Sequence, residues 1–403
     1  VFRLLQYARP ILVGPWTNAH RGHKFDFNQP TSFARQPSPP LRYRRLSLES
    51  RSISGGAQMN VTQTRAEKLL KKLVNHPSPT AIQNQVRETH AIIASELQRL
   101  GFQINWHRDA SGKTDDLLIA EKPSTVRKND FVTFVSHIDT VLSVEEAGPY
   151  REGHSQIDEQ APVRLAHGAG IIDNKGGLVV LIESLREYLN ETPEPPVGLR
   201  VVSSPDEESG STAWHRLFQD IGTKSIAVLG FEPALEDGAI IVSRRGNRWY
   251  NIQVQGIEAH AGRCRGEEIN AAHEAATLIT RLVGEVQELK KQQGTPLGEG
   301  LSLHVGHIEG GRGKHNIVCG DVHIKLDTRF SNFHERELIH HLVIDTLSQT
   351  NHSTFEIVDD CPPFDRDAQY GDVVTQLLTA LSESEGRNIQ AVKAGGAGDV
   401  NHM

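Results

Sequence analysis

Acidic and histidine side chains follow directly after three short apolar segments of this chain of 403 residues. They are His137 and Asp139 after residues 131–136, Asp206, Glu207 and Glu208 after residues 199–205, and Glu232 after residues 226–231. A further acid, Asp173, lies in the glycine-rich stretch of residues 168–177. Because ligands bind outside the carboxyl ends of the strands in an open α/β sheet, we expect these side chains to meet in one crevice.

One imidazole with several carboxylates suits zinc or a similar divalent ion, and a carboxylate between two ions can bridge a two-metal site. Each cluster alone has a plainer explanation, because a single histidine after a strand is usually a structural residue and adjacent glutamates usually face water. The glycine-rich stretch lacks the order GxxxxGK of a phosphate loop. Four clusters at equivalent places in the fold therefore favour a metal centre.

From Thr62 onward the spacing of apolar residues predicts an α/β domain with a mostly parallel sheet flanked by helices. Its helices are expected over residues 84–100 and 177–189, and its buried strands over 116–120, 131–136, 198–203 and 225–230. After Ser243 the pattern changes to that of an inserted α+β domain. Its strands are expected over residues 248–255, 301–308 and 321–329, and its helix over 268–292. Residues 354–358 and 388–393 are expected to return to the first sheet.

Length and composition narrow the class of protein. The chain exceeds the roughly 100–200 residues of one domain, so we expect two domains. It has no apolar run of the about 18–20 residues that a membrane span needs, which excludes an integral membrane protein. Three scattered cysteines without a CxxC pair argue against a disulfide framework and suit a reducing compartment, so the expected location is the cytoplasm.

Charge divides the chain into two unlike parts. Residues 1–58 carry nine Lys and Arg against two Asp and Glu, whereas the remainder carries 34 against 48. The acidic remainder argues against a nucleic-acid partner. The basic, proline-rich part is expected to be a leader without a fold, either upstream or processed sequence or an organelle transit peptide. The expected domain boundaries are then 59–243 and 351–403 for the metal-binding domain and 244–350 for the inserted domain.

Six motifs occur in one order along the chain: HxDT at 137–140, GxGxxDxKGG at 168–177, DEExGS at 206–211, EP at 232–233, AHAG at 259–262 and GGxxD at 395–399. This series resembles the co-catalytic metallopeptidase family of carboxypeptidase G, acetylornithine deacetylase, succinyl-diaminopimelate desuccinylase and aminoacylase. The resemblance implies a zinc-peptidase-like α/β fold with an inserted ferredoxin-like dimerisation domain. It also implies two zinc ions per subunit, a homodimer, and a peptide or N-acyl amino acid as the substrate.

The resemblance implies a metal-binding role for each matching residue. His137 and Glu232 would hold one zinc ion, Glu208 would bind the other, and Asp173 would bridge both. Asp139 would orient the imidazole of His137, as metal-bound histidines usually require. A cis peptide bond is implied directly after the bridging acid.

The resemblance also implies the residues that act on the substrate. Glu207 would be the general base, taking a proton from the attacking water and passing it to the leaving amine. His260 would reach the neighbouring subunit and stabilise the developing oxyanion. Asn316 and Arg329 would hold the carboxylate of the substrate, with Gly396 beside it, although a surface salt bridge is the alternative for Arg329. The nearby His304, His307 and His315 are expected to be solvated strand residues and not a metal site.

In the family the last metal ligand is a histidine beyond the GGxxD motif, and the chain stops at Met403. On this resemblance one metal position is expected to be incomplete. Three functions stay open: a carboxypeptidase G-like release of a C-terminal amino acid, an N-acyl-amino-acid deacylase, and an inactive dimerising remnant that only binds. The segment Ser243–Gly246 and the following strand favour the first.

Overall fold

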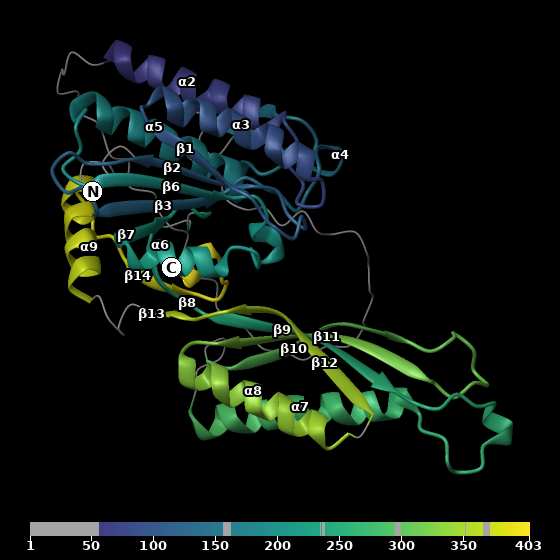
Figure 1. Cartoon of the computed structure of the whole chain (residues 1–403). Coiled ribbons are helices and arrows are strands. Elements are labelled where there is room, and N and C mark those ends of the chain that lie inside the picture. The colour runs from purple at the N-terminus through teal and green to yellow at the C-terminus, as the bar shows by residue number, and fades with distance from the viewer. Residues whose placement is uncertain are drawn as a thin grey trace.

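The computed structural model describes residues 56–155, 163–233, 235, 238–294, 300–350, 352–365 and 371–403. The expected leader lies outside these residues as far as residue 55. Figure 1 shows two bodies, a larger one that carries both ends of the described chain and a smaller one reached through β8 and β9. No helix in the described part is long and apolar enough to span a membrane.

A five-stranded sheet forms the centre of the larger body. Its order is β1 (Gln103–His107), β2 (Leu117–Lys122), β6 (Gly198–Ser204), β3 (Phe131–His137) and β7 (Ser225–Gly230). β3 pairs in parallel with β6 and β7, whereas the β1–β2 and β2–β6 pairs are antiparallel. The predicted α/β fold is therefore confirmed, and its sheet is mixed.

Helices cover both faces of this sheet (Figure 1). They are α2 (Gly56–Val74), α3 (Gln83–Arg99) and α5 (Gly176–Glu191) on one face and α6 (His215–Thr223) on the other. Phe218 and Ile221 of α6 pack against Val202 of β6. β3 lies at the centre of the sheet with all seven residues buried, because its apolar and β-branched side chains face a helix on either side. Its carboxyl end therefore has a fixed position.

The smaller body, which we call the inserted domain, comprises residues 246–361. Its sheet has the order β10 (Ser302–Gly310), β11 (Asp321–Phe330), β9 (Gly246–Gln255) and β12 (Ser353–Cys361), and every pair is antiparallel. α7 (Ala271–Gln292) and α8 (Phe333–Ser348) pack on one face, so that the chain order is β-α-β-β-α-β. This is the ferredoxin-like arrangement.

The expected place of residues 354–358 in the first sheet is wrong, because β12 pairs with β9 of the inserted domain and aligns Phe355 with Ile252. The sequence reasoning missed α8, whose 16 residues return the chain to the free edge of β9. A prediction that lacks α8 contains no element that brings residues 353–361 back beside β9.

Residues 388–393 also do not join the first sheet. β14 (Ala391–Ala394) pairs in parallel with β8 (Ile240–Arg244), and β13 (Phe364–Asp365) pairs with the other edge of β8 in a separate three-stranded sheet. β8 was not predicted as a strand. A single residue separates it from β9, so β8 and β9 form the direct connection between the two bodies.

The remaining elements are short or peripheral. They are α4 (Val144–Ala147), the hairpin of β4 (Arg151–Ser155) and β5 (Val163–His167), a kinked turn at Ile171–Lys175, α9 (Gly371–Glu385), and 3₁₀ turns at Glu207–Ser209, Ala261–Arg263 and Asp399–His402. The turn at Glu207–Ser209 directly follows β6, as predicted for a functional loop at a strand end.

Candidate active site

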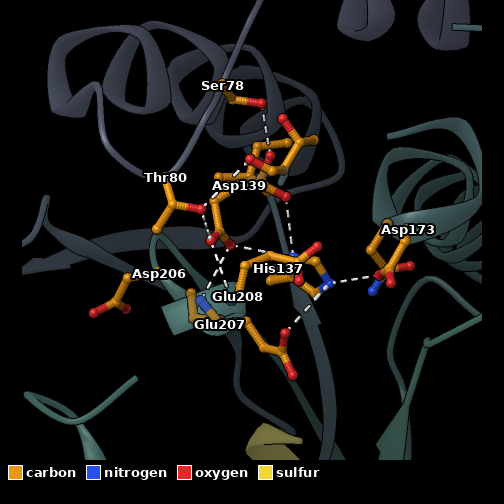
Figure 2. A network of polar contacts seen from close by, with 12 residues as sticks. Ser78, Thr80, His137, Asp139, Asp173, Asp206, Glu207 and Glu208 are labelled. Atoms are coloured by element: carbon orange, nitrogen blue, oxygen red, sulfur yellow. Dashed lines mark hydrogen bonds and ion pairs between the residues drawn. The ribbon is translucent and has the colours of Figure 1, made fainter. Parts of the chain in front are cut away.

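His137 is the last residue of β3 and is fully buried. Its Nδ1 lies 3.1 Å from Oδ1 of Asp139, and its Nε2 lies 2.9 Å from Oδ1 of Asp173 (Figure 2). Asp139 therefore orients the ring so that Nε2 points toward Asp173. This is the arrangement that a histidine ligand needs, because the partner of one ring nitrogen sets the role of the other.

The buried carboxylate of Asp139 also positions the loop after β6. It accepts hydrogen bonds from the backbone N–H groups of Glu207 at 3.1 Å and Glu208 at 3.2 Å. The hydroxyl of Thr80 donates a further bond to it at 2.8 Å (Figure 2). One side chain thus ties the end of β3, the turn after β6 and the segment before α3 into one rigid unit.

Three side chains can each offer one ligand atom to a metal ion, with all three atoms within 4.8 Å of one another. They are His137, Asp173 and Glu208, which we call the metal-ligand group. In the described part of the chain no other set of three histidine, cysteine or acidic residues meets this condition. One imidazole and two carboxylates fit zinc, since catalytic zinc sites commonly keep about three protein ligands and an open position.

Glu207 lies beside this group, with Oε2 3.9 Å from Nε2 of His137. Glu232 lies two residues beyond the end of β7 and is not a member of the metal-ligand group. Its charge nevertheless contributes to the pKa values of both His137 and Glu207. Glu207 therefore borders the metal-ligand group, and Glu232 lies within electrostatic reach of it.

The acids at this site are electrostatically crowded. Burial, together with the charges of Asp399 and Glu232, raises the pKa of Glu207 to about 9, although His137 opposes the shift. Burial and the neighbouring Asp173 raise the pKa of Glu208 to about 7. Such repulsion among carboxylates is what a divalent cation would relieve, so the charges of the site also fit a metal ion.

The imidazole of His137 lies between the carboxylates of Asp139 and Asp173, and both affect its pKa. Burial lowers the pKa of His137, but its hydrogen bonds to Asp139 and Asp173 outweigh this effect, and the pKa is raised well above its ordinary value. A proton on Nε2 and a metal ion would compete for the same lone pair.

The predicted residues of the inserted domain do not join this cluster in the single chain. The backbone N–H of Gly262 donates to Nδ1 of His260 at 3.1 Å, and Nε2 of His260 lies 3.2 Å from the side-chain amide of Asn316. Both contacts of this ring are with residues of the inserted domain. Both side chains are exposed, and the loop between β9 and α7 extends away from the five-stranded sheet (Figure 1).

The other two predicted substrate contacts differ from each other. The guanidinium of Arg329 makes three hydrogen bonds to the carboxylate of Asp327, at 2.7, 2.8 and 3.1 Å, so its fork is already engaged. Gly396 lies in the loop after β14 and borders open space. His304, His307 and His315 are exposed and form no metal-ligand group among the described residues.

The sequence is similar to that of known metallopeptidases and amide hydrolases. Residues 242–354 match a family model described as the peptidase dimerisation domain, M20_dimer. Over 220 residues the chain is 30% identical to carboxypeptidase G2 of Pseudomonas sp. (strain RS-16), covering 53% of this chain and 50% of that protein. It is 23% identical over 222 residues to the succinyl-diaminopimelate desuccinylase of Rickettsia canadensis (strain McKiel), covering 53% and 55%. The resemblance to the M20 metallopeptidase family is confirmed.

The chain spans about half the length of the curated relatives that it matches. Solved structures resemble this fold over a larger share of the chain than the sequence matches cover. The aminopeptidase PepT of Bacillus cereus superposes with a TM-score of 0.64 at 23% identity, over 84% of this chain and 87% of that one. An M20 family metallo-carboxypeptidase from Sulfolobus solfataricus superposes with a TM-score of 0.63 at 17% identity, over 84% and 87%. Both bodies of the chain thus have an M20-like arrangement.

The cis peptide bond implied by the M20 resemblance is present between Asp173 and Asn174. Two supporting residues were missed from the sequence. Thr80 bonds Asp139, and no motif marks it. Asp399 is buried and accepts a hydrogen bond from Ser204, the last residue of β6. The GGxxD motif ends at Asp399 and could have identified it.

Proposed function

We propose that this protein is a metal-dependent hydrolase that cleaves an amide or peptide C–N bond. The observation that carries the proposal is the metal-ligand group with the carboxylate of Glu207 beside it, 3.9 Å from His137. Metal ligands and an adjacent proton acceptor are the two components that hydrolysis by activated water requires.

In this proposal His137, Asp173 and Glu208 hold the metal, and Glu232 supports them from the end of β7. When bound, the metal would polarise the scissile carbonyl and lower the pKa of a water molecule. Glu207 takes a proton from the attacking water and delivers it to the leaving nitrogen. Asp139 positions the base, because its carboxylate accepts a hydrogen bond from the backbone N–H of Glu207 at 3.1 Å.

The finer proposal is release of a C-terminal amino acid, as in a carboxypeptidase. Supporting it, the identity to carboxypeptidase G2 is 30%, against 23% to a desuccinylase over a similar span. The second candidate is an N-acyl-amino-acid deacylase, and the similarity to a desuccinylase supports it. Both reactions use the same ligands and the same base, and they differ in the acyl group that the site accepts.

We further propose a homodimer assembled through the inserted domain. The match of residues 242–354 to a peptidase dimerisation domain supports it. The exposed position of His260 agrees with a role in the site of a second subunit. Asn316 is expected to bind substrate beside it.

We propose that the domains divide near residue 243, as the sequence suggests. The second division belongs after β12, near residue 361, because β12 pairs with β9.

The described cysteines, Cys264, Cys319 and Cys361, are all free thiols, which supports a cytoplasmic location.

The test begins with the full chain loaded with zinc. Bound metal is measured by mass spectrometry, and N-acyl amino acids and dipeptides are assayed before and after chelation, with the products identified. Loss of activity on chelation and recovery with zinc are expected. His137→Ala should lose both metal and activity, whereas Arg127→Gln, a change in the loop before β3, should lose neither. A zinc-loaded protein that hydrolyses no member of the panel would favour a binding remnant.

A further inference from the structure

The glycine-rich motif that carries Asp173 also carries a buried lysine. Lys175 ends the turn at Ile171–Lys175, two residues after Asp173, and its side chain is fully buried. Among the ion pairs of the described residues, none includes Lys175. Because a buried charge is costly unless other groups compensate it, the ammonium needs partners other than an acid.

Two backbone carbonyl groups serve as these partners. Nζ of Lys175 donates to the backbone oxygen of Leu73 at 3.0 Å and to that of His76 at 2.8 Å. Leu73 belongs to the last turn of α2, and His76 lies two residues beyond its end. The last carbonyl groups of a helix lack partners within the helix, and a helix C-terminus attracts cations. The end of α2 therefore stabilises the ammonium and fixes its position.

The same stretch of the chain is also bonded to the residues that follow β3. The hydroxyl of Ser78 donates to the backbone oxygen of Ile138 at 2.8 Å, and that of Thr80 donates to Asp139 at 2.8 Å (Figure 2). We call residues 73–80 the α2 end segment. This segment therefore contacts the loop after β3 directly and the turn of the glycine-rich motif through the lysine.

Asp173 depends on its neighbours for its position. Its side chain is 48% exposed, and among the described residues its carboxylate bonds only Nε2 of His137. The next two residues, Asn174 and Lys175, are fully buried. Nδ2 of Asn174 donates to Oγ of Ser136 in β3 at 3.0 Å, while Lys175 binds the α2 end segment. These two contacts fix the backbone on one side of the acid.

We propose that Lys175 is a positioning residue of the metal site, which fastens the turn of Asp173 to the α2 end segment and so sets the place of the Asp173 carboxylate relative to His137. The α2 end segment then supports two parts of the site, the loop after β3 and the turn with its acid. The inference rests on the proposed hydrolase function and adds to it a residue that orders the ligands before an ion binds.

The experiment measures the zinc affinity of the full chain by competition with a chelator of known affinity. Lys175→Met removes the ammonium and keeps a long side chain. It should lower zinc affinity about 10- to 100-fold, the usual loss when a residue that orients a metal ligand is changed. The visible absorption of the Co(II)-loaded chain should change as well, because a displaced ligand alters the geometry around the ion.

Arg200→Met is the matched control. Arg200 is a buried cation within β6, and its Nε lies 2.7 Å from Oε1 of Glu121. Because its loss breaks a largely buried ion pair away from the site, thermal stability should fall. The zinc affinity and the Co(II) spectrum should stay as in the wild type.

A double substitution tests whether Lys175 acts through Asp173. Asp173→Asn alone should weaken zinc binding because a ligand is lost. Adding Lys175→Met should then cause little further loss, since the effects of two residues that act as one unit are not additive. Losses that add in full would overturn the proposal.

Unchanged zinc affinity and an unchanged Co(II) spectrum in Lys175→Met, with lower thermal stability, would leave the lysine a purely structural role and overturn the proposal. If that variant does not fold, Lys175→Gln, which keeps a neutral donor, should still weaken zinc binding. Failure of both variants to fold with zinc present would also refute the proposal. A wild-type chain that binds zinc but hydrolyses nothing contradicts the proposed function alone, whereas one that binds no zinc refutes both.

Discussion

The metal-ligand group and the His260–Asn316 pair are built in opposite ways. His137 and Asp139 are fully buried and joined by hydrogen bonds to three other segments of the chain, at Thr80, Asp173 and Glu207. His260 and Asn316 are exposed, and their described contacts are local. The contacts that hold the first region come from segments far apart in the chain, whereas those of the second come from within the inserted domain.

This difference follows from what each region must do. A metal site needs ligands held in place before the ion arrives, so its positions are fixed by the centre of the sheet and by Asp139. A group that contacts a transition state across a subunit boundary must remain accessible until assembly. The bond from the backbone of Gly262 and the contact with Asn316 hold the ring of His260 through residues of its own domain.

The largest expected effect is at the base. Glu207→Gln keeps the shape of the side chain but cannot accept a proton, so kcat should fall by about 10²- to 10⁴-fold. Bound zinc should remain close to the wild-type amount because the metal-ligand group is intact. Steady-state kinetics with metal analysis checks this, and full activity in the variant would remove Glu207 from the mechanism.

The next effect tests the exposed region. His260→Ala should lower kcat by about 10²- to 10³-fold, the loss typical for removal of one oxyanion donor, while zinc content stays the same. His304→Ala, which removes another exposed histidine of the inserted domain, is the matched control and should keep full activity. Loss of zinc in His260→Ala would contradict the division of roles between the two regions.

A smaller effect is expected at the residue that organises the buried region. Asp139→Asn retains the volume of the side chain but weakens the bond that orients His137. Zinc affinity should fall by about 10- to 100-fold, as is usual when the partner of a metal-bound histidine is removed. Competition with a chelator of known affinity measures it. An unchanged affinity would mean that the backbone alone positions His137.

The smallest effect is a pH dependence of folding in the buried region. His90 lies under the site with Nε2 2.9 Å from Oγ of Ser203, and burial lowers its pKa from 6.5 to about 3. The unfolded chain therefore binds a proton that the folded chain excludes, and stability falls as the pH drops below 6.5. Between pH 6.5 and 5 this proton uptake lowers the free energy of unfolding by about 1–2 kcal/mol. Urea unfolding of His90→Gln should show a shallower pH slope, and an unchanged slope would refute this.

The residues of the proposed site could be located from the sequence, but their contacts could not. An apolar run followed by His137 or by Glu207 and Glu208 is a local pattern, and parallel strands place such ends at one edge. That Asp139 bonds the backbone of Glu207 depends on two segments 68 residues apart in the chain. Similarly, nothing in the local pattern of residues 354–358 indicates which sheet they join.

The sequence by itself determined the α/β class, the positions of most central strands, and the side chains that could hold a metal, because apolar periodicity and strand-end chemistry are properties of neighbouring residues. Only the tertiary structure decided that β12 belongs to the inserted domain, that Asp327 engages Arg329, and that Asp139 bonds the backbone of Glu207. Those outcomes depend on the pairing of strands and the direction of side chains that are distant in the chain, and packing alone sets both.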